Sequence, residues 1–401
     1  MTALPSAEQR RLTHAVASAS DEALARVVAV FDRMADRREA DRLLDAARPR
    51  LRRLRPPRPI AFTRLLFLPL DGVIADSRAW KRADGGLPRS ALPALGDAVR
   101  LAIGAAATTI EEGFAGRSFA DLAAVDAAGR RLWRAAAAGA ASLAPPPAWE
   151  GTGLGEAGFR HCVALAAGVW RHADPLWTAM LAAREGPPAP LVQAALAAAA
   201  AEDPAVIEAM IATLLTKAAK PGSVVSAAAS ARVGPAGAAE RVLDRWIEEC
   251  RPDLSVSDPK GAAELAEEFA EALDDLEGSE AARRPERRQR VLALRRTVGE
   301  ACRAAFAESA AHHLVEPLAR AGARVDDAAI GAMEATARSL RRLEAAGRRL
   351  GGASAYDAAL RKVTDSFAAL RGRPETNPAD LARLTEILVG PEAALKLLDG
   401  G

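Results

Sequence analysis

Large apolar side chains are most densely spaced between Ile60 and Ile74, in the segment IAFTRLLFLPLDGVI. Elsewhere most apolar positions are alanine, and they recur every three or four residues, which predicts amphipathic helices. Within the segment, Pro69 predicts a break in any helix, and Asp71-Gly72 is a turn signal. The segment is therefore predicted to be a short apolar element that turns. It is shorter than the roughly 20 residues that a membrane-spanning helix needs.

The sequence allows two interpretations of this apolar segment. If it is buried, each large side chain contributes roughly 1.5–3 kcal/mol to folding. If it is exposed, the same side chains form an apolar patch, which usually marks an interface. The candidate interaction residues under the second interpretation are Leu65, Leu66, Phe67, Leu68, Leu70 and Trp80.

The N-terminal part of the chain is predicted to be a helical hairpin followed by a basic segment. Apolar residues between Leu24 and Met34 recur at helical spacing. Arginines and prolines then mix between residues 48 and 59, which predicts a linker. These arginines are candidate contacts for a polyanion, but no aromatic residues are interleaved with them, so we favour a solvated connector. The candidate residues are Arg50, Arg52, Arg53, Arg55 and Arg58.

A capping residue followed by proline recurs along the chain from about residue 156 onward. Asp or Asn before a helix accepts unpaired backbone N–H groups, and proline fits the first helical position because its missing N–H is not needed there. The spacing of roughly 24–31 residues is near the size of a helical-hairpin repeat, so a repeat array and an irregular bundle are both possible. The predicted starts are Asp174-Pro175, Asp203-Pro204, Asp258-Pro259 and Asn377-Pro378, with Gly234-Pro235 and Gly390-Pro391 as weaker versions.

The hydrophobic pattern predicts the residue ranges of several individual helices. Residues 186–201 carry no charge and predict a buried central helix. Residues 280–320 and 326–349 are predicted to form two long helices that pair in antiparallel fashion. The remaining predicted helices cover residues 91–107, 118–142, 354–371 and 378–398.

Proline clusters and shifts in composition divide the chain into four predicted parts. The clearest break is the three prolines at 145–147. The predicted parts are an N-terminal helical hairpin (1–55), an apolar segment with helices (56–147), an alanine-rich helical core array (148–278), and a long antiparallel helix pair with C-terminal helices (279–401).

Composition points to one fold class. The 401 residues are 50% hydrophobic but only 4% aromatic, and alanine, the best helix former, is abundant. Residues that strands prefer are sparse. The chain is therefore predicted to be all-α. We expect a multi-helix bundle or an irregular, solenoid-like array of helical hairpins, with little or no β structure.

Charge and cysteine content limit the partners and the compartment. The 54 basic residues, mostly arginine, are balanced by 52 acidic residues, which disfavours a general polyanion binder. The three cysteines are too few and too far apart for a disulfide framework or a zinc motif. The opening residues MTALPSAEQRRL lack the apolar core of a secretory signal. We therefore expect a cytoplasmic protein with no transmembrane segment.

The segment FLPLDGVIADS resembles the first motif of the haloacid-dehalogenase-type phosphatases. The later positions of that motif are matched by Asp71, Gly72, Val73, Asp76 and Ser77. The position of the nucleophilic aspartate is occupied by Pro69, which has no carboxylate and cannot form the aspartyl-phosphate intermediate. The match covers about ten residues and no alternating strand–helix pattern follows it, so we assign the chain to no family.

Two further short motifs lack the structural context that their chemistry needs. The segment GLGEAG at 153–158 matches the dinucleotide-binding pattern, but prolines and not a strand precede it. The segment SDPK at 257–260 matches the SxxK pattern of acyl-serine enzymes, but its Asp-Pro pair predicts a helix start inside the motif. We therefore predict no catalytic residues.

One group of side chains has metal-ligand chemistry. Three of its members are spaced four residues apart, on one face of a predicted helix, and helical bundles do host such sites. A complete site needs ligands from a second helix, and we favour surface Glu–His pairs with a partly buried histidine as the explanation of the spacing. We expect no metal and no cofactor. If a metal binds, the predicted ligands are Glu308, His312, His313 and Glu316.

The leading functional hypothesis is a non-enzymatic helical scaffold or adaptor that binds another protein. The first alternative is a regulatory nucleic-acid-binding protein that uses the arginine runs at 48–58, 283–296 and 338–349, which steep salt dependence of binding would reveal. The second alternative is a helical enzyme whose site has no recognisable motif, which a perturbed histidine or a bound metal would reveal. The oligomeric state is not predicted.

Overall fold

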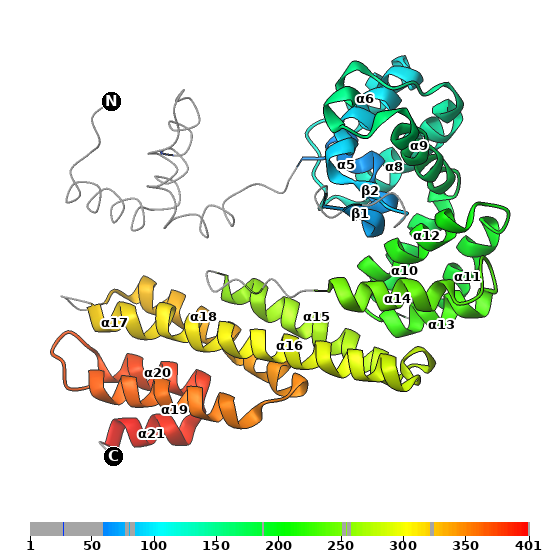
Figure 1. Cartoon of the computed structure of the whole chain (residues 1–401). Helices are drawn as coiled ribbons and strands as arrows, with labels where there is room; N and C mark the ends of the chain where they lie inside the picture. The colour runs from blue at the N-terminus through cyan, green and yellow to red at the C-terminus, as the bar shows by residue number, and fades with distance from the viewer. Residues whose placement is uncertain are drawn as a thin grey trace. The chain divides into compact units, whose positions relative to one another are not determined.

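The computed structural model describes residues 59–76, 80, 85–186, 188–250, 254, 258–320 and 325–399, together with residue 27. Most of these residues lie in helices (Figure 1), and they contain a single two-stranded parallel pair. The predicted all-α fold with little β structure is therefore confirmed. Apart from residue 27, the predicted hairpin at 1–55 lies outside the described residues, and so do the candidate polyanion contacts from Arg50 to Arg58.

The chain divides into two compact units. The first comprises Met1–Ile60 and Phe114–Val125, and the second comprises Ala61–Gly113 and Asp126–Gly401. Within the first unit, the N–H of Ile60 donates to the carbonyl of Arg117 at 2.9 Å. The four-part division predicted from the sequence stays a prediction.

The apolar segment opens the second unit as a series of short elements. They are α5 (Phe62–Leu66), the 3₁₀ helix η2 (Leu68–Val73), and β1 (Ile74–Ala75), which pairs in parallel with β2 (Leu87–Pro88). Two buried indoles hold the segment in place. Trp133 donates to the carbonyl of Leu65, and Trp170 donates to the carbonyl of Leu66, each at 2.9 Å. These bonds satisfy carbonyls that such a short helix leaves without partners.

Nine α-helices of the described residues follow before the long C-terminal ones. They are α6 (Leu92–Ile103), α7 (Ala105–Phe114), α8 (Leu122–Gly139), α9 (Gly155–Arg171), α10 (Ala173–Glu185), α11 (Ala189–Ala198), α12 (Pro204–Lys217), α13 (Pro221–Ala231) and α14 (Ala238–Glu249). The predicted helix at 91–107 ends early because Gly104 adopts a φ of +56°. The chain bends there by 112° into α7.

Gly72 brings η2 against α12. Its N–H donates to Oγ1 of Thr213 at 3.3 Å, and a Cβ atom at this position would lie 2.2 Å from the carbonyl carbon of Ala212. No other residue fits unless one of the two elements moves. Next to it, Asp71 accepts hydrogen bonds from both terminal nitrogens of Arg64, at 2.8 and 2.9 Å. The Asp-Gly pair of the phosphatase-like motif therefore serves packing and an ion pair.

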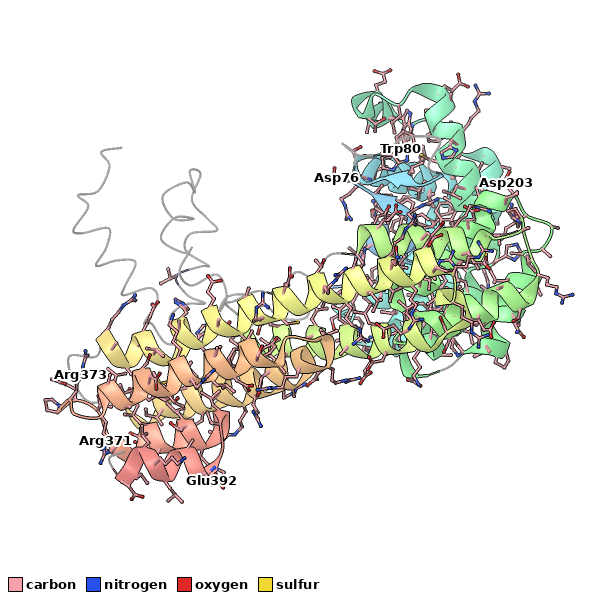
Figure 2. All side chains as sticks on the ribbon, turned by 60° about the horizontal axis from the view of Figure 1, so that its bottom comes forward. Asp76, Trp80, Asp203, Arg371, Arg373 and Glu392 are labelled. Atoms are coloured by element: carbon pink, nitrogen blue, oxygen red, sulfur yellow. The ribbon has the colours of Figure 1, made fainter. Side chains whose placement is uncertain are left out.

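Most of the predicted cap–proline starts are present. The side chains of Asp203, Asp258 and Asn377 accept N–H groups in the first turns of α12, α15 and α20 (Figure 2 labels Asp203). The weaker Gly390-Pro391 signal also begins a helix, α21. The physical basis of these predictions is local, because a cap needs only its own first turn.

Two predicted starts are wrong. Asp174 lies inside the first turn of α10, because α9 runs into α10 at His172, and its carboxylate accepts a hydrogen bond from Arg134 at 2.7 Å. Helix α14 begins beyond Gly234-Pro235, after Gly237 with a φ of +74°. In both places a tertiary contact or a second glycine determines where the helix begins.

The prediction of a buried helix at 186–201 is also corrected. Helix α11 buries Val192, Ala195 and Leu196, but Leu191 is 41% exposed. The absence of charge in this segment reflects its alanine content and not complete burial. Helix α11 therefore has one solvent-facing side.

The C-terminal part of the second unit consists of long helices. They are α15 (Pro259–Gly278), α16 (Pro285–Ala310), the π-helix η8 (Ala311–Val315), α17 (Glu316–Arg320), α18 (Asp327–Leu350), α19 (Ala353–Leu370), α20 (Pro378–Leu388) and α21 (Pro391–Asp399). Arg295 in α16 donates to the carbonyl of Arg349 near the end of α18, at 2.7 Å. Because the C-terminal end of α18 lies beside the first half of α16, the two long helices are antiparallel, as the sequence predicts.

Candidate functional site

The apolar residues predicted as an interaction site lie in the core of the second unit. Exposure is 0% for Leu65, Leu66 and Leu70, 1% for Phe67 and 8% for Leu68. The Phe67 ring packs on Trp170, with ring centroids 5.9 Å apart. The interface interpretation of this segment is therefore corrected: a partner cannot reach these side chains without unfolding the elements around them.

Trp80, another predicted interaction residue, lines a cavity. It is half-buried, and its indole N–H donates to the carbonyl of Gly86 at 2.8 Å. Its ring lies 6.3 Å from the ring of His161. The Trp80 side chain therefore contacts Gly86 and α9, and it lines a cavity.

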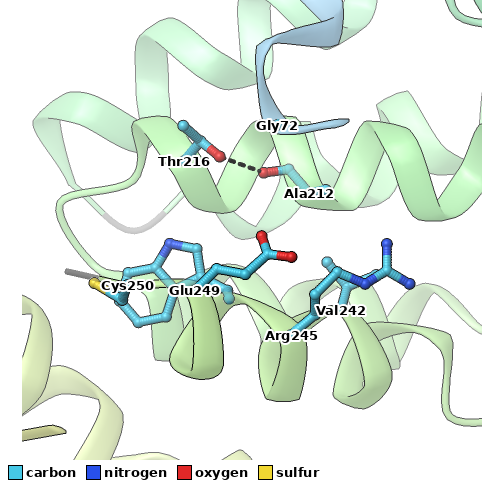
Figure 3. A pocket seen from close by; sticks show the side chains of 8 residues that line it. Gly72, Ala212, Thr216, Val242, Arg245, Glu249 and Cys250 are labelled. Carbon is cyan, nitrogen blue, oxygen red and sulfur yellow. Dashed lines mark hydrogen bonds between the residues drawn. The ribbon is translucent and has the colours of Figure 1, made fainter. Parts of the chain in front are cut away.

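Two adjoining cavities of about 210 and 310 Å³ separate the η2–β1 segment from α14. Both are lined by Gly72, Arg245 and Glu249, and the smaller is shown in Figure 3. Trp246 lines the smaller cavity and Trp80 the larger one. Indole rings beside an arginine and a carboxylate can bind a small amphipathic group. The sequence did not reveal this arrangement, because segments far apart in the chain build it.

The arginine runs at 283–296 and 338–349 form ion pairs, some within one helix and some between helices. Arg287 donates to both carboxylate oxygens of Asp244, at 2.7 and 2.9 Å, and these hydrogen bonds lower the pKa of Asp244. Arg295 donates to two acidic side chains of α15, at 2.6 Å each. On α18 the pairs are Arg338 with Glu334, Arg341 with Glu344, Arg342 with Glu267, Arg348 with Glu344 and Asp357, and Arg349 with Asp274.

These pairs change what the arginine runs can do. Glu344 is only 2% exposed, so a phosphate that drew its arginines away would leave a buried carboxylate unpaired, which is costly. The arginines of the α18 run are therefore structural: some pair within α18, and others tie α18 to α15 and to α19.

Glu202 forms a comparable network near the start of α12. Its carboxylate accepts hydrogen bonds from Arg171 at 2.8 and 2.6 Å and contacts Nε2 of His172 at 2.9 Å. The hydrogen bonds from Arg171, assisted by His172, lower the pKa of Glu202 to about 2, although partial burial opposes the shift. His172 therefore takes part in a structural network.

The predicted metal ligands lie around the π-helix η8. His312 Nδ1 lies 3.7 Å from an oxygen of Glu316, and the rings of His312 and His313 meet edge to face at 4.8 Å. Glu308 precedes the π-helix, whose extra residue per turn displaces it from the regular four-residue spacing. Within the described ranges, no three His, Cys, Asp or Glu side chains are grouped to hold a metal ion.

The two other short motifs have the local structure that their flanking residues predict. The glycine-rich segment follows a 3₁₀ helix over Pro147–Thr152, and its Gly155 begins α9. The carbonyl of Gly155 accepts a hydrogen bond from the indole N–H of Trp149 at 2.9 Å. The SxxK segment contains the first residue of α15, Pro259, and its Ser257 lies outside the described residues.

An apolar groove of about 500 Å³ separates α19 from the hairpin of α20 and α21. Helix α21 packs on α20, and Arg371 donates to the carbonyl of Leu398 at 2.6 Å, which fixes the end of α21 beside α19. The apolar lining consists of Leu360, Ala368, Val389, Ala393 and Leu397. We name this feature the C-terminal groove.

The hairpin of the last two helices carries three exposed large apolar side chains, of which Val389 lines the C-terminal groove. Val389 is 38% exposed, Leu395 60% and Leu398 43%. Elsewhere in the described part of the chain such side chains occur singly on separate helices, at Leu101, Leu122, Leu191 and Leu292. Single exposed apolar residues are ordinary, whereas several of them on one short helical hairpin favour a binding surface.

The rim of the C-terminal groove carries charges of both signs. Asp357 is bound by Arg348 at 2.5 Å. Among the described residues, no ion pair joins Arg361, Asp365 or Lys396 to another side chain, although all three line the groove. Two cations and one carboxylate are therefore available to an occupant, which favours one with acidic flanks.

The chain matches no known family model, no curated protein and no solved structure. Within the described residues, no single helix is long and apolar enough to cross a membrane. The bent pair at 89–103 and 105–114 meets the length and composition criteria only when its two helices are taken together.

Proposed function

We propose that this protein is a non-enzymatic helical scaffold that acts by binding another protein chain through the C-terminal groove. The observation that carries the proposal is an apolar groove of about 500 Å³ lined by the exposed Val389, on a helical hairpin that also carries the exposed Leu395 and Leu398. The occupant is an amphipathic helix, whose apolar side chains at i, i+3 and i+4 fill such a groove. The cationic rim at Arg361 and Lys396 requires acidic residues beside its apolar stripe.

The internal use of charge supports this function over nucleic-acid binding. A nucleic-acid-binding surface needs arginines free to neutralise phosphates. On α18, most arginines are paired with acidic side chains of the same unit. An apolar partner surface is consistent with this arrangement because it leaves the pairs intact. The scaffold is assigned to the cytoplasm, where its three free cysteines stay reduced.

A photo-cross-linker tests the proposal in cells. Benzoylphenylalanine replaces Ala368, which is exposed on the groove wall. The matched control carries it at Gly331, which faces open space on α18. We expect an adduct from position 368 alone, mapped by mass spectrometry to an amphipathic helical segment with acidic flanks, and its loss in a Val389→Asp background. An adduct with nucleic acid, or none specific to position 368, refutes the proposal.

A ligand-binding or enzymatic role is the second candidate, and the cavities beside Gly72 are its support. Trp80, Trp246, Arg245 and Glu249 line them, and cavities of this composition bind small amphipathic molecules. Tryptophan fluorescence during a screen of such compounds tests this role. Saturable quenching that is lost in Glu249→Ala favours it, and an unchanged spectrum with every compound rejects it.

A further inference from the structure

We infer that the helix received by the C-terminal groove is α21 of a second copy of this chain. The inference rests on the proposed function, because it names the occupant of the same groove. Its starting point is the pattern of α21, whose sequence PEAALKLLD places large apolar residues on two sides of one short helix.

The two apolar sides of α21 have different roles within one copy. Ala394 and Leu397 are buried against the rest of the C-terminal helices. Leu395 and Leu398 are exposed and three residues apart, so they form a continuous apolar ridge one turn long. We name this pair the α21 ridge. Covering it with an apolar surface is favourable, and nothing in the described residues of the same copy does so.

The ridge and the groove lie on opposite sides of α21. Each residue of an α-helix turns by about 100°, so residues two apart point in nearly opposite directions. Leu395 is two residues from Ala393, and Leu398 is two residues from Lys396. Ala393 and Lys396 line the groove. One copy therefore presents a groove on one side of α21 and a ridge on the other.

The charges on the two surfaces are complementary. Glu392 and Asp399 lie within about 60° of Leu395 around the helix axis, and both are exposed (Figure 2 labels Glu392). The rim of the groove presents two available cations, Arg361 and Lys396, and one available carboxylate, Asp365. A leucine ridge flanked by carboxylates thus matches an apolar groove with a mainly cationic rim, which is the chemistry that the groove requires of its occupant.

This geometry determines the symmetry of the contact. A two-fold interface uses the same patch on both copies, whereas a contact between a ridge on one side and a groove on the other is head-to-tail. Each copy then keeps one unused ridge or groove and can add a further copy. The predicted assembly therefore grows with concentration and does not stop at two chains.

The symmetry supplies a test with the full-length chain. The ridge variant is Leu395→Asp with Leu398→Asp, and the groove variant is Ala368→Asp with Val389→Asp. Light scattering after size exclusion, from about 1 to about 100 μM, covers moderate affinities. We expect the wild-type mass to rise above the 41.9 kDa of one chain, and each variant alone to stay at that mass. Each exposed leucine contributes more than about tenfold to association, so the double change weakens it about a hundredfold or more.

An equal mixture of the two variants is the decisive sample. The ridge variant keeps an intact groove and the groove variant keeps an intact ridge, so we expect a complex of two chains and no larger species. Circular dichroism checks the helix content, with serine in place of aspartate if an aspartate variant loses it. The control is Leu191→Asp, an exposed leucine on α11, which is expected to assemble as the wild type does.

Three results overturn the inference: a wild-type mass of one chain at every concentration, a mixture that stays at the mass of one chain, or assembly of either variant alone. The cross-linking experiment separates this failure from that of the proposed function. An adduct from position 368 with a different protein rejects the second copy as occupant and retains the scaffold. The absence of any specific adduct rejects both.

Discussion

Replacing Gly72 by alanine tests the packing on which the second unit is built. A Cβ at this position would lie 2.2 Å from the carbonyl carbon of Ala212 and 2.3 Å from the backbone nitrogen of Thr213. These are backbone atoms of α12, so no side chain can rotate away. The segment η2 has to withdraw by about 1 Å to restore ordinary contact, and the hydrogen bond from Gly72 to Thr213, already 3.3 Å long, is lost with it.

The expected cost follows from these contacts. Overpacking a close contact costs about 1–3 kcal/mol and occasionally more, and losing a hydrogen bond adds about 1 kcal/mol. We therefore expect Gly72→Ala to destabilise the protein by about 3 kcal/mol. With a urea dependence of about 3 kcal/mol per molar, the unfolding midpoint falls by about 1 M.

The matched control is the same substitution at Gly331. That residue lies inside α18 with no heavy atom within 4 Å of an added Cβ. Alanine is favoured over glycine in a helix by about 1 kcal/mol, so Gly331→Ala is expected to raise the urea midpoint. Circular dichroism at 222 nm follows both transitions. A Gly72→Ala protein with the wild-type midpoint would show that η2 and α12 are not packed as described, and the reasoning would be refuted.

Three further predictions concern charges and thiols. The carboxylate of Glu202, with its pKa lowered from 4.5 to about 2, stabilises the fold above pH 4.5, and this contribution is lost as the pH falls towards 2. The urea midpoints of wild type and Glu202→Gln should therefore differ at pH 7 and converge near pH 2. The same difference between the two midpoints at both pH values would contradict the lowered pKa of Glu202. Arg295→Ala breaks hydrogen bonds to Asp274 and Glu277, so it should lower the free energy of unfolding by about 1–3 kcal/mol. Arg296→Ala, on the exposed side of α16, should lower it by less than about 0.5 kcal/mol. Equal urea midpoints for the two variants would count against the ion-pair network. Cys250 should be the one thiol that reacts quickly with a thiol reagent in the native state, since burial raises the pKa of the other two to about 11; rapid labelling of all three would contradict their burial.

Local signals in the sequence predicted the fold where local chemistry determines the structure. The caps at Asp203, Asp258 and Asn377 act within their own first turns, and the amphipathic stripe of α18 was readable over its whole length. The helix break at Gly104 and the start of α10 were missed. The first requires a positive φ that a glycine permits but does not demand, and the second depends on contacts made after the chain has folded.

The binding surface was harder to predict than the helices. The apolar segment from Ile60 to Ile74 attracted the interface hypothesis because its side chains are large, yet large side chains are also what a core needs, and here they are buried. The exposed Leu395 and Leu398 are spaced like core residues, and only the position of α21 at the edge of its helices leaves them uncovered. A sequence reports apolarity, whereas exposure depends on which elements surround a helix.

The size of the native assembly in cell extract tests the central claim most directly. Size exclusion of the extract, followed by detection of the chain, compares wild type, the groove variant Ala368→Asp with Val389→Asp, and the control Leu191→Asp. If the C-terminal groove is the binding surface, wild type and control elute well above 41.9 kDa, and the groove variant elutes as a single chain. A groove variant that elutes with wild type, or a wild type that elutes as one chain, would contradict the claim.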